Sequence, residues 1–222
     1  MTGATPFSRI KRSTLGDDVY ETLRSAVLEH TLAPGHRVNI DALARDLEVS
    51  PTPVREALAR LESDGLVRKR ALAGYTVSPL LTRAEFTDLF DMRLLLECNA
   101  AHRAAEHATD PQRDELSQEA ARIIEGGDDH AWHAAFTTHD ARLHHLVAQA
   151  SASPLLLDAI TRLHAHLHLH RRHFPYEHTA ITHQEHRDLA KAITDGDADR
   201  AGKAMRRHLT RARDRHLVAF TE

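Results

Sequence analysis

The sequence predicts a mainly α-helical protein, with an N-terminal winged helix-turn-helix followed by an antiparallel bundle of six helices. Three observations support this fold class. Apolar residues recur at helical spacing over most of the 222 residues. Residues 66–70 and 75–77 flank a small loop that contains Gly74, which indicates a short hairpin. Beyond Ser78, Pro- and Gly-containing pairs separate helical periods, and no strand alternation of useful length is found.

The first elements are an arm and a helix. Residues 1–14 are expected to form a flexible arm, because they are polar and become basic towards their end. Residues 15–31 follow as an amphipathic helix with Val19, Leu23 and Val27 on its inner face. A Pro-Gly pair then ends this helix.

Two further helices joined by a tight corner form the centre of the first domain. The first covers residues 41–47. The second begins at Pro51, where Ser50 is expected to accept a hydrogen bond from an unpaired backbone N–H group. Its inward stripe consists of Val54, Ala57, Leu58 and Leu61. Its other faces carry Thr52 and Arg55, and a recognition helix presents such a basic, hydroxyl-bearing end to the major groove of DNA.

The hairpin after this helix corresponds to the wing. Arg68, Lys69 and Arg70 can contact phosphates, whereas Gly74 lets the loop approach a DNA backbone or minor groove without a side chain in the way. We therefore expect the first domain, residues 15–78, to bind double-stranded DNA.

The net charge of −3 is unexpected for a protein that binds DNA. Residues up to Ser78 contain eleven basic and ten acidic side chains, and the rest contain eighteen and twenty-two. The charge that recognises DNA must therefore be local. The single cysteine, Cys98, allows no internal disulfide, and no apolar run reaches the ~20 residues of a membrane span. A cytoplasmic protein without a membrane partner is expected.

The second domain, residues 79–222, is predicted to consist of the six-helix bundle, with short connections typical of antiparallel neighbours. The helices are expected at residues 83–107, 111–124, 129–149, 154–172, 178–194 and 198–220. The expected N-caps are Thr82, Asp110, Ser153 and Asp197, the first within a capping box.

Histidine is concentrated in the second domain, which holds seventeen of the nineteen. Most of these side chains are expected to be solvated. Asp140 and His144 differ, because a spacing of four residues places both on one helix face beside apolar residues. His186 and His208 are placed among apolar positions on two other helices. A carboxylate and three imidazoles that converge from three helices would hold a divalent metal ion with open positions left over.

Four alternating histidines in the fourth helix of the bundle form two pairs spaced by four residues. They are His164, His166, His168 and His170. Each pair can hold a metal or line a cavity, and the simpler alternative is one solvated pair and one pair that fills the interior.

Residues 49–67, with the sequence VSPTPVREALARLESDGLV, resemble the signature of GntR-family bacterial transcription regulators. The resemblance implies that Ser50, Thr52, Arg55 and Gly74 contact operator DNA. The alternative is that the arginines of this helix only solvate its surface. The candidate DNA-binding residues are Ser50, Thr52, Arg55, Arg60, Arg68, Arg70 and Gly74.

The bundle is similar to the FCD effector domain of the FadR subgroup of these regulators. The similarity lies in residues 139–144 (HDARLH) and 150–156 (ASASPLL), and in the short motifs Glu185-His186 and Arg207-His208-Leu209. A count of six rather than seven helices favours the VanR-like branch. The resemblance covers residues 15–216 and implies a set of metal ligands. They are Asp140, His144, His186 and His208.

Such a centre has one charged ligand, so a bound Zn²⁺, or alternatively Ni²⁺ or Mn²⁺, keeps net positive charge and can accept a carboxylate. The resemblance therefore implies a small organic acid as effector. Arg93 matches a family arginine near the cavity and can pair with that acid. The alternative for Arg93 is an ion pair with Glu97, four residues away. A purely structural role for the metal is also open.

The expected function is allosteric regulation of transcription, by repression or activation, through a homodimer that binds a pseudo-palindromic operator. No enzymatic activity is expected. A metal-dependent hydrolase fused to a DNA-binding domain is the alternative from another class, but no HExxH motif, nucleophile elbow or glycine-rich phosphate loop supports it. A third alternative is an architectural DNA-binding protein that is indifferent to metals and acids.

Overall fold

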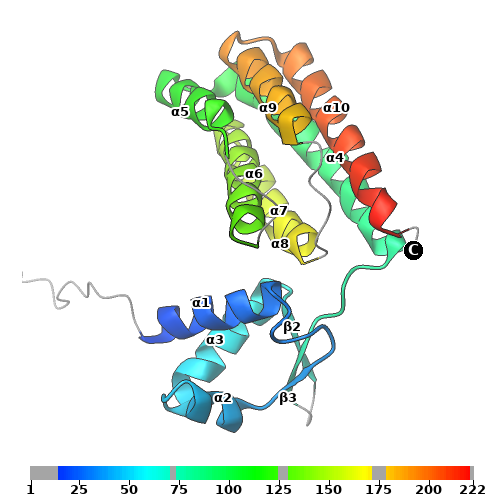
Figure 1. Ribbon diagram of the computed structural model, residues 1–222. Helices are drawn as coiled ribbons and strands as arrows, with labels where there is room; N and C mark the ends of the chain where they lie inside the picture. The colour runs from blue at the N-terminus through cyan, green and yellow to red at the C-terminus, as the bar shows by residue number, and fades with distance from the viewer. Residues whose placement is uncertain (1–14, 71–73, 125–129, 172–178, 221–222) are drawn as a thin grey trace, which may run out of the picture. The chain divides into compact units, whose positions relative to one another are not determined.

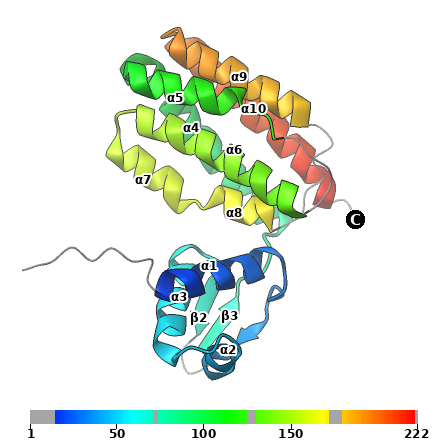
Figure 2. The ribbon, with the colours of Figure 1, turned by 60° about the vertical axis from the view of Figure 1, so that its left-hand side comes forward.

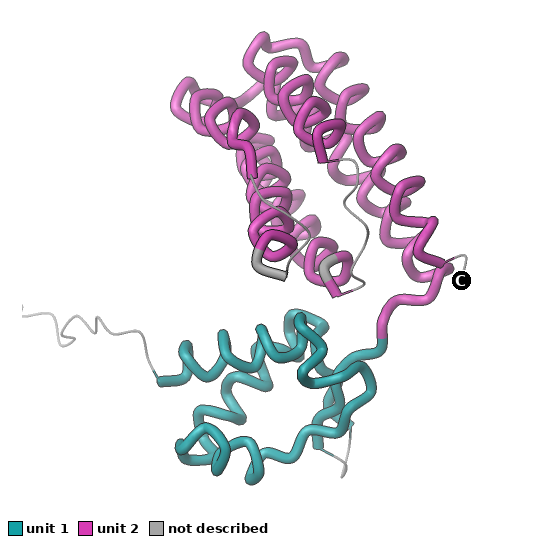
Figure 3. Tube along the Cα trace, in the orientation of Figure 1, with its two compact units in different colours: residues 1–79 teal, residues 80–222 magenta. Residues whose placement is uncertain are grey.

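The computed structural model describes residues 15–70, 74–124, 130–171 and 179–220. The chain divides into two compact units, Met1–Pro79 and Leu80–Glu222, which Figure 3 colours teal and magenta. The expected flexible arm, residues 1–14, lies outside the described residues. In the described part of the chain, no helix is long and apolar enough to cross a membrane.

The first unit is a winged helix-turn-helix (Figure 1). Its elements are α1 (Leu15–Leu28), β1 (Arg37–Val38), α2 (Ile40–Asp46), α3 (Pro51–Ser63), β2 (Val67–Arg70) and β3 (Gly74–Val77). The wing strand β3 lies in the middle of the sheet and is antiparallel to β1 and β2. The sequence did not predict β1, because two residues are too few to show alternation.

The core of the first unit confirms the predicted helical stripes. Helix α1 packs against α3. The predicted inward residues of α3 are fully buried, and Val19, Leu23 and Val27 of α1 are buried as well. Leu66 and Val77 of the wing complete this core.

The predicted cap of α3 was wrong in one respect. Ser50 is the N-cap residue, but its side chain makes no capping hydrogen bond. An N-cap side chain usually accepts from the second or third helical N–H group, and the third position here is Pro53, which has none. Ser50 therefore keeps an exposed hydroxyl.

The second unit is a helical bundle (Figures 1 and 2). Its elements are α4 (Arg83–His107), α5 (Asp110–Ala121), α6 (His130–Ala150), α7 (Pro154–Arg162), α8 (Ala165–His170), α9 (Thr179–Thr194), α10 (Ala198–Leu217) and the 3₁₀ turn η1 (Val218–Phe220). Helix α4 packs against α6, α7, α9 and α10 and so runs through the core. The predicted capping box holds its start, because the Glu85 N–H donates to the Thr82 hydroxyl at 3.2 Å.

Two details of the predicted bundle were wrong. Residues Leu80 to Phe220 form seven α-helices where described, not six, because the helix expected at 154–172 breaks at His164. His164 has φ +46°, in the left-handed region that a helix cannot continue through. The helix count therefore gives no support to the VanR-like branch. In addition, Thr109 rather than Asp110 is the N-cap of α5, and its N–H donates to Gln112 at 3.0 Å.

Candidate metal centre and nucleic-acid interface

Four side chains from three helices converge inside the bundle. Asp140 and His144 come from α6, His186 from α9 and His208 from α10. One ligand atom of each lies within 4.8 Å of the others, and the three imidazoles are buried. The spacing of four residues on α6 gives the first pair, while the packing of α9 and α10 brings the other two.

The distances between these atoms suit a metal ion. The Nε2 atoms of His144 and His208 are 3.2 Å apart, and His186 Nε2 lies 3.1 Å from Asp140 Oδ1. Two ligand atoms at ~2.0–2.1 Å from one zinc ion are separated by roughly 3.3 Å in tetrahedral geometry. A five- or six-coordinate ion on the same four residues would keep a position for a further ligand.

The protonation states also suit a metal ion. Burial lowers the pKa of His144, and it lowers that of His208 to about 3, so both rings are neutral near pH 7. Burial acts to raise the pKa of Asp140, but the nearby imidazoles of His166 and His186 hold it well below its ordinary value. A neutral imidazole and an ionised carboxylate are the forms that ligate metals.

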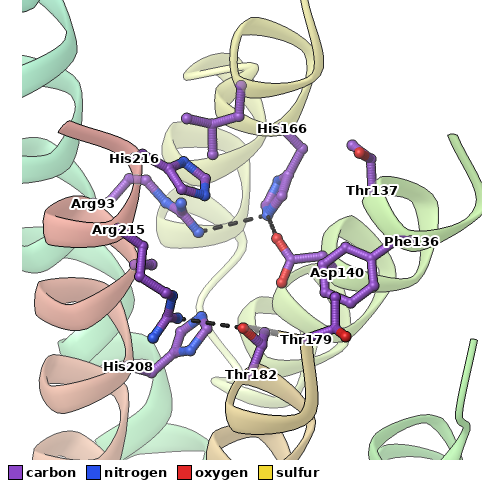
Figure 4. Close-up of a pocket in the computed structure, with 12 residues that line it drawn as sticks. Arg93, Phe136, Thr137, Asp140, His166, Thr179, Thr182, His208, Arg215 and His216 are labelled. Atoms are coloured by element: carbon purple, nitrogen blue, oxygen red, sulfur yellow. Dashed lines mark hydrogen bonds and ion pairs between the residues drawn. The ribbon is translucent and has the colours of Figure 1, made fainter. Parts of the chain in front are cut away.

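A cavity of about 40 Å³ lies beside this cluster, and Figure 4 shows its lining. Asp140 and His208 form part of its wall, so a ligand in the cavity would reach the proposed ion. His166 of α8 also lines it, with Nε2 at 3.1 Å from Asp140 Oδ2. The break at His164 starts α8 and so sets the direction from which His166 approaches.

Arg93 lies where both of its predicted roles, effector binding and an ion pair with Glu97, can be judged. It lines the cavity, yet it is only 1% exposed, and its Nε donates to Glu97 Oε1 at 2.6 Å. Its Nη2 lies 3.5 Å from His166 Nε2. The ion pair with Glu97 therefore engages Nε of the side chain that the resemblance assigned to the effector, while Arg93 still lines the cavity.

A second arginine of the cavity wall, Arg215, was not predicted. It donates to the Thr182 hydroxyl at 3.3 Å (Figure 4). It also donates to Glu185 Oε2 at 3.0 Å. Its position seven residues after His208 on α10 places both on one helix face. That spacing is the sequence signal that would have found it.

The seven candidate DNA-binding residues are all exposed in the first unit. Gly74 begins β3 with φ +77°, a conformation that favours glycine. Arg55, Arg68 and Arg70 form no ion pair or hydrogen bond with other described side chains. Arg60, in contrast, has partners within the first unit.

Arg60 is held within the first unit. Its guanidinium lies 3.9 Å from the centre of the Tyr20 ring, and its Nη1 is 2.7 Å from Asp17 Oδ1. Stacking and charge therefore direct Arg60 towards α1.

Comparisons with known proteins match both units. A model of bacterial regulatory proteins of the gntR family matches residues 15–77, and a model of the FCD domain matches residues 88–211. The "Nta operon transcriptional regulator" of Aminobacter aminovorans is 27% identical over 189 residues, covering 83% of this chain and 86% of the relative. The "HTH-type transcriptional repressor NanR" of Salmonella typhimurium is 27% identical over 222 residues, covering 90% of this chain and 83% of the relative.

Solved structures show the same fold. E. coli McbR/YncC gives a TM-score of 0.68 at 20% identity, with 90% of this chain and 96% of that chain covered. A putative GntR transcriptional regulator from Rhodococcus sp. RHA1 gives 0.67 at 21% identity, with 92% and 98% covered.

Proposed function

Because the chain belongs to the GntR family of bacterial transcription regulators and carries an FCD domain of the FadR type, it is a DNA-binding regulator, and we propose that a small carboxylate bound at a metal centre controls its operator affinity. The observation that carries this proposal is the convergence of Asp140, His144, His186 and His208 beside a cavity. The matched relatives are regulators, so we do not propose a metal-dependent hydrolase.

DNA recognition is proposed to use a homodimer on a pseudo-palindromic operator. Thr52 and Arg55, with Ser50 before them, meet the major groove, because they are exposed at the N-terminal end of α3. The wing contributes Arg68, Arg70 and Gly74. Arg60 is left out of this set because α1 already engages it. The protein is proposed to repress transcription, because the relative NanR is named a repressor.

The donors fit a divalent ion such as Zn²⁺, with Ni²⁺ or Mn²⁺ as alternatives. Three imidazoles and one carboxylate match the preferences of these metals. When bound, the ion would supply positive charge next to the cavity. The protein itself orients the acid through Arg93, His166 and Thr182 in the cavity wall.

Charge and size restrict the proposed effector. Arg93 is paired with Glu97 and Arg215 with Glu185, so each arginine of the wall is neutralised. With Asp140 as its one charged ligand, a divalent metal centre would keep one net positive charge. A single carboxylate would match that charge. The cavity beside this centre is small, at about 40 Å³. A compact monocarboxylate therefore matches this centre better than a dicarboxylate.

Thermal-shift screening of the zinc-loaded protein tests the effector proposal. Monocarboxylates of two to four carbons are expected to raise Tm and to change operator affinity, because a ligand stabilises the state that binds it. Dicarboxylates of equal chain length are the matched comparison. If dicarboxylates alone raise Tm, or if no acid changes operator binding, the proposal is wrong.

Arg55→Ala is expected to weaken operator binding by ~1–3 kcal/mol, about 5- to 150-fold, if Arg55 reads a base. The operator is first selected from random DNA with the wild-type protein, and affinities are then measured by fluorescence anisotropy. Arg60→Ala is the control on the same helix, and its operator affinity should stay within about twofold of wild type. Equal losses for both variants would contradict the placement of α3 on DNA.

A further inference from the structure

Two buried glutamates each contact one histidine of the four proposed ligands. Glu97 of α4 is 3% exposed, and its Oε2 contacts Nδ1 of His144. Glu185 of α9 is also 3% exposed, and its Oε2 lies 3.0 Å from Nδ1 of His208. Both carboxylates therefore face the ring nitrogen that points away from the other ligands.

These contacts select the nitrogen that is free to bind a metal. In a neutral imidazole, the nitrogen that faces a carboxylate carries the proton and donates it as a hydrogen bond. The lone pair then lies on Nε2. The Nε2 atoms of His144 and His208 are the pair that lie 3.2 Å apart inside the cluster.

Each glutamate is itself fixed by an arginine of the cavity wall. Arg93 Nε lies 2.6 Å from Glu97 Oε1, and Arg215 Nη2 lies 3.0 Å from Glu185 Oε2. Each glutamate therefore contacts both an arginine and a ligand histidine. Hydrogen bonds between charged partners are the stronger ones, so the arginines hold both carboxylates in place.

We infer that Glu97 and Glu185 are positioning residues for the metal centre: they fix the tautomer and orientation of His144 and His208 and thereby tighten ion binding. The inference rests on the proposed metal centre. Carboxylates that accept from ligating histidines act in this way in metal sites, and their loss typically costs about 10- to 100-fold in metal affinity.

The chain contains a matched control outside the cluster. Glu119 of α5 is also buried; its Oε1 lies 2.7 Å from Nδ1 of His139, and Arg142 Nε lies 3.0 Å from its Oε2. This is the same combination of arginine, glutamate and histidine. His139, however, is not one of the four converging residues.

The test compares Zn²⁺ affinity in full-length wild type, Glu185→Gln and Glu119→Gln by competition with a chromophoric chelator. Glu185→Gln is expected to bind Zn²⁺ about 10- to 100-fold more weakly, and Glu119→Gln to stay within about threefold of wild type. The d–d absorption of bound Co²⁺ should change in Glu185→Gln alone. Equal Zn²⁺ affinity in the two variants would overturn the inference.

A second measurement needs no variant. Long-range ¹H–¹⁵N correlation spectra of the metal-free wild type should show His144 and His208 protonated at Nδ1, and protonation at Nε2 would overturn the inference even if Glu185→Gln fails to fold. Failure of the proposed function is recognised separately, because wild type would then bind no stoichiometric Zn²⁺. If wild type binds Zn²⁺ and Glu185→Gln binds it equally well, only the inference fails.

Discussion

Replacing His144 and His208 together by alanine is expected to abolish stoichiometric metal binding. A four-ligand zinc site contributes ~10–16 kcal/mol, or roughly 3 kcal/mol for each ligand, so the loss of two should weaken binding by ~10⁴-fold. The two rings are buried, and their Nε2 atoms are 3.2 Å apart, so no solvent-exposed side chain replaces them readily. Elemental analysis after dialysis against trace metal measures the ion content per chain.

The control for this experiment is His139→Ala. His139 directly precedes Asp140 and is buried like the three ligand histidines, yet it lies outside the converging set. This variant should keep its metal. The double variant should still bind operator in its metal-free form, because the first unit has its own core. Retention of one ion per chain by the double variant would show that the proposed ligand set is wrong.

Glu97→Ala is expected to lower the free energy of unfolding of the second unit by ~3–5 kcal/mol, because it leaves the buried charge of Arg93 without its counter-charge. Trp132 is the single tryptophan and lies in α6, so its fluorescence during urea unfolding reports on the second unit. The m-value should stay near that of wild type, since the surface exposed on unfolding hardly changes.

The matched variant replaces both partners, as Arg93→Met with Glu97→Leu. It removes the charge and the counter-charge together, and well-packed apolar replacements of a buried pair are often close to neutral. It should therefore be more stable than Glu97→Ala. If the single and the double variant unfold at the same urea concentration, the pair does not contribute in this way.

Much of the helical architecture could be predicted because its signals are local. The capping box at Thr82 fixes the start of α4, and the predicted bounds of that helix, 83–107, are those observed. The inward stripe of α3 depends only on spacing. The break at His164 could not be predicted, since it needs a left-handed residue and histidine, unlike glycine, gives no signal for one.

In the candidate site, too, features that depend on local spacing could be predicted, and contacts between helices could not. Asp140 and His144 are four residues apart on one helix, so their shared face is visible in the sequence. The contact between Glu97 and His144 joins residues 47 apart, and it depends on how α4 packs against α6. In the sequence, Glu97 shows only its spacing from Arg93, which predicts an intrahelical ion pair and nothing about the ligands.

The contacts between α1 and α3 also bear on how DNA is read. The Tyr20 hydroxyl donates to Asp64 at 2.6 Å, and burial and this bond raise the pKa of Tyr20 to about 12. Asp64 is the C-cap of α3, so the far end of that helix is fastened. Because α3 is held rigidly before the protein binds DNA, the first unit loses little conformational entropy on binding. A rigid α3 also cannot tilt to accommodate a mismatched base pair.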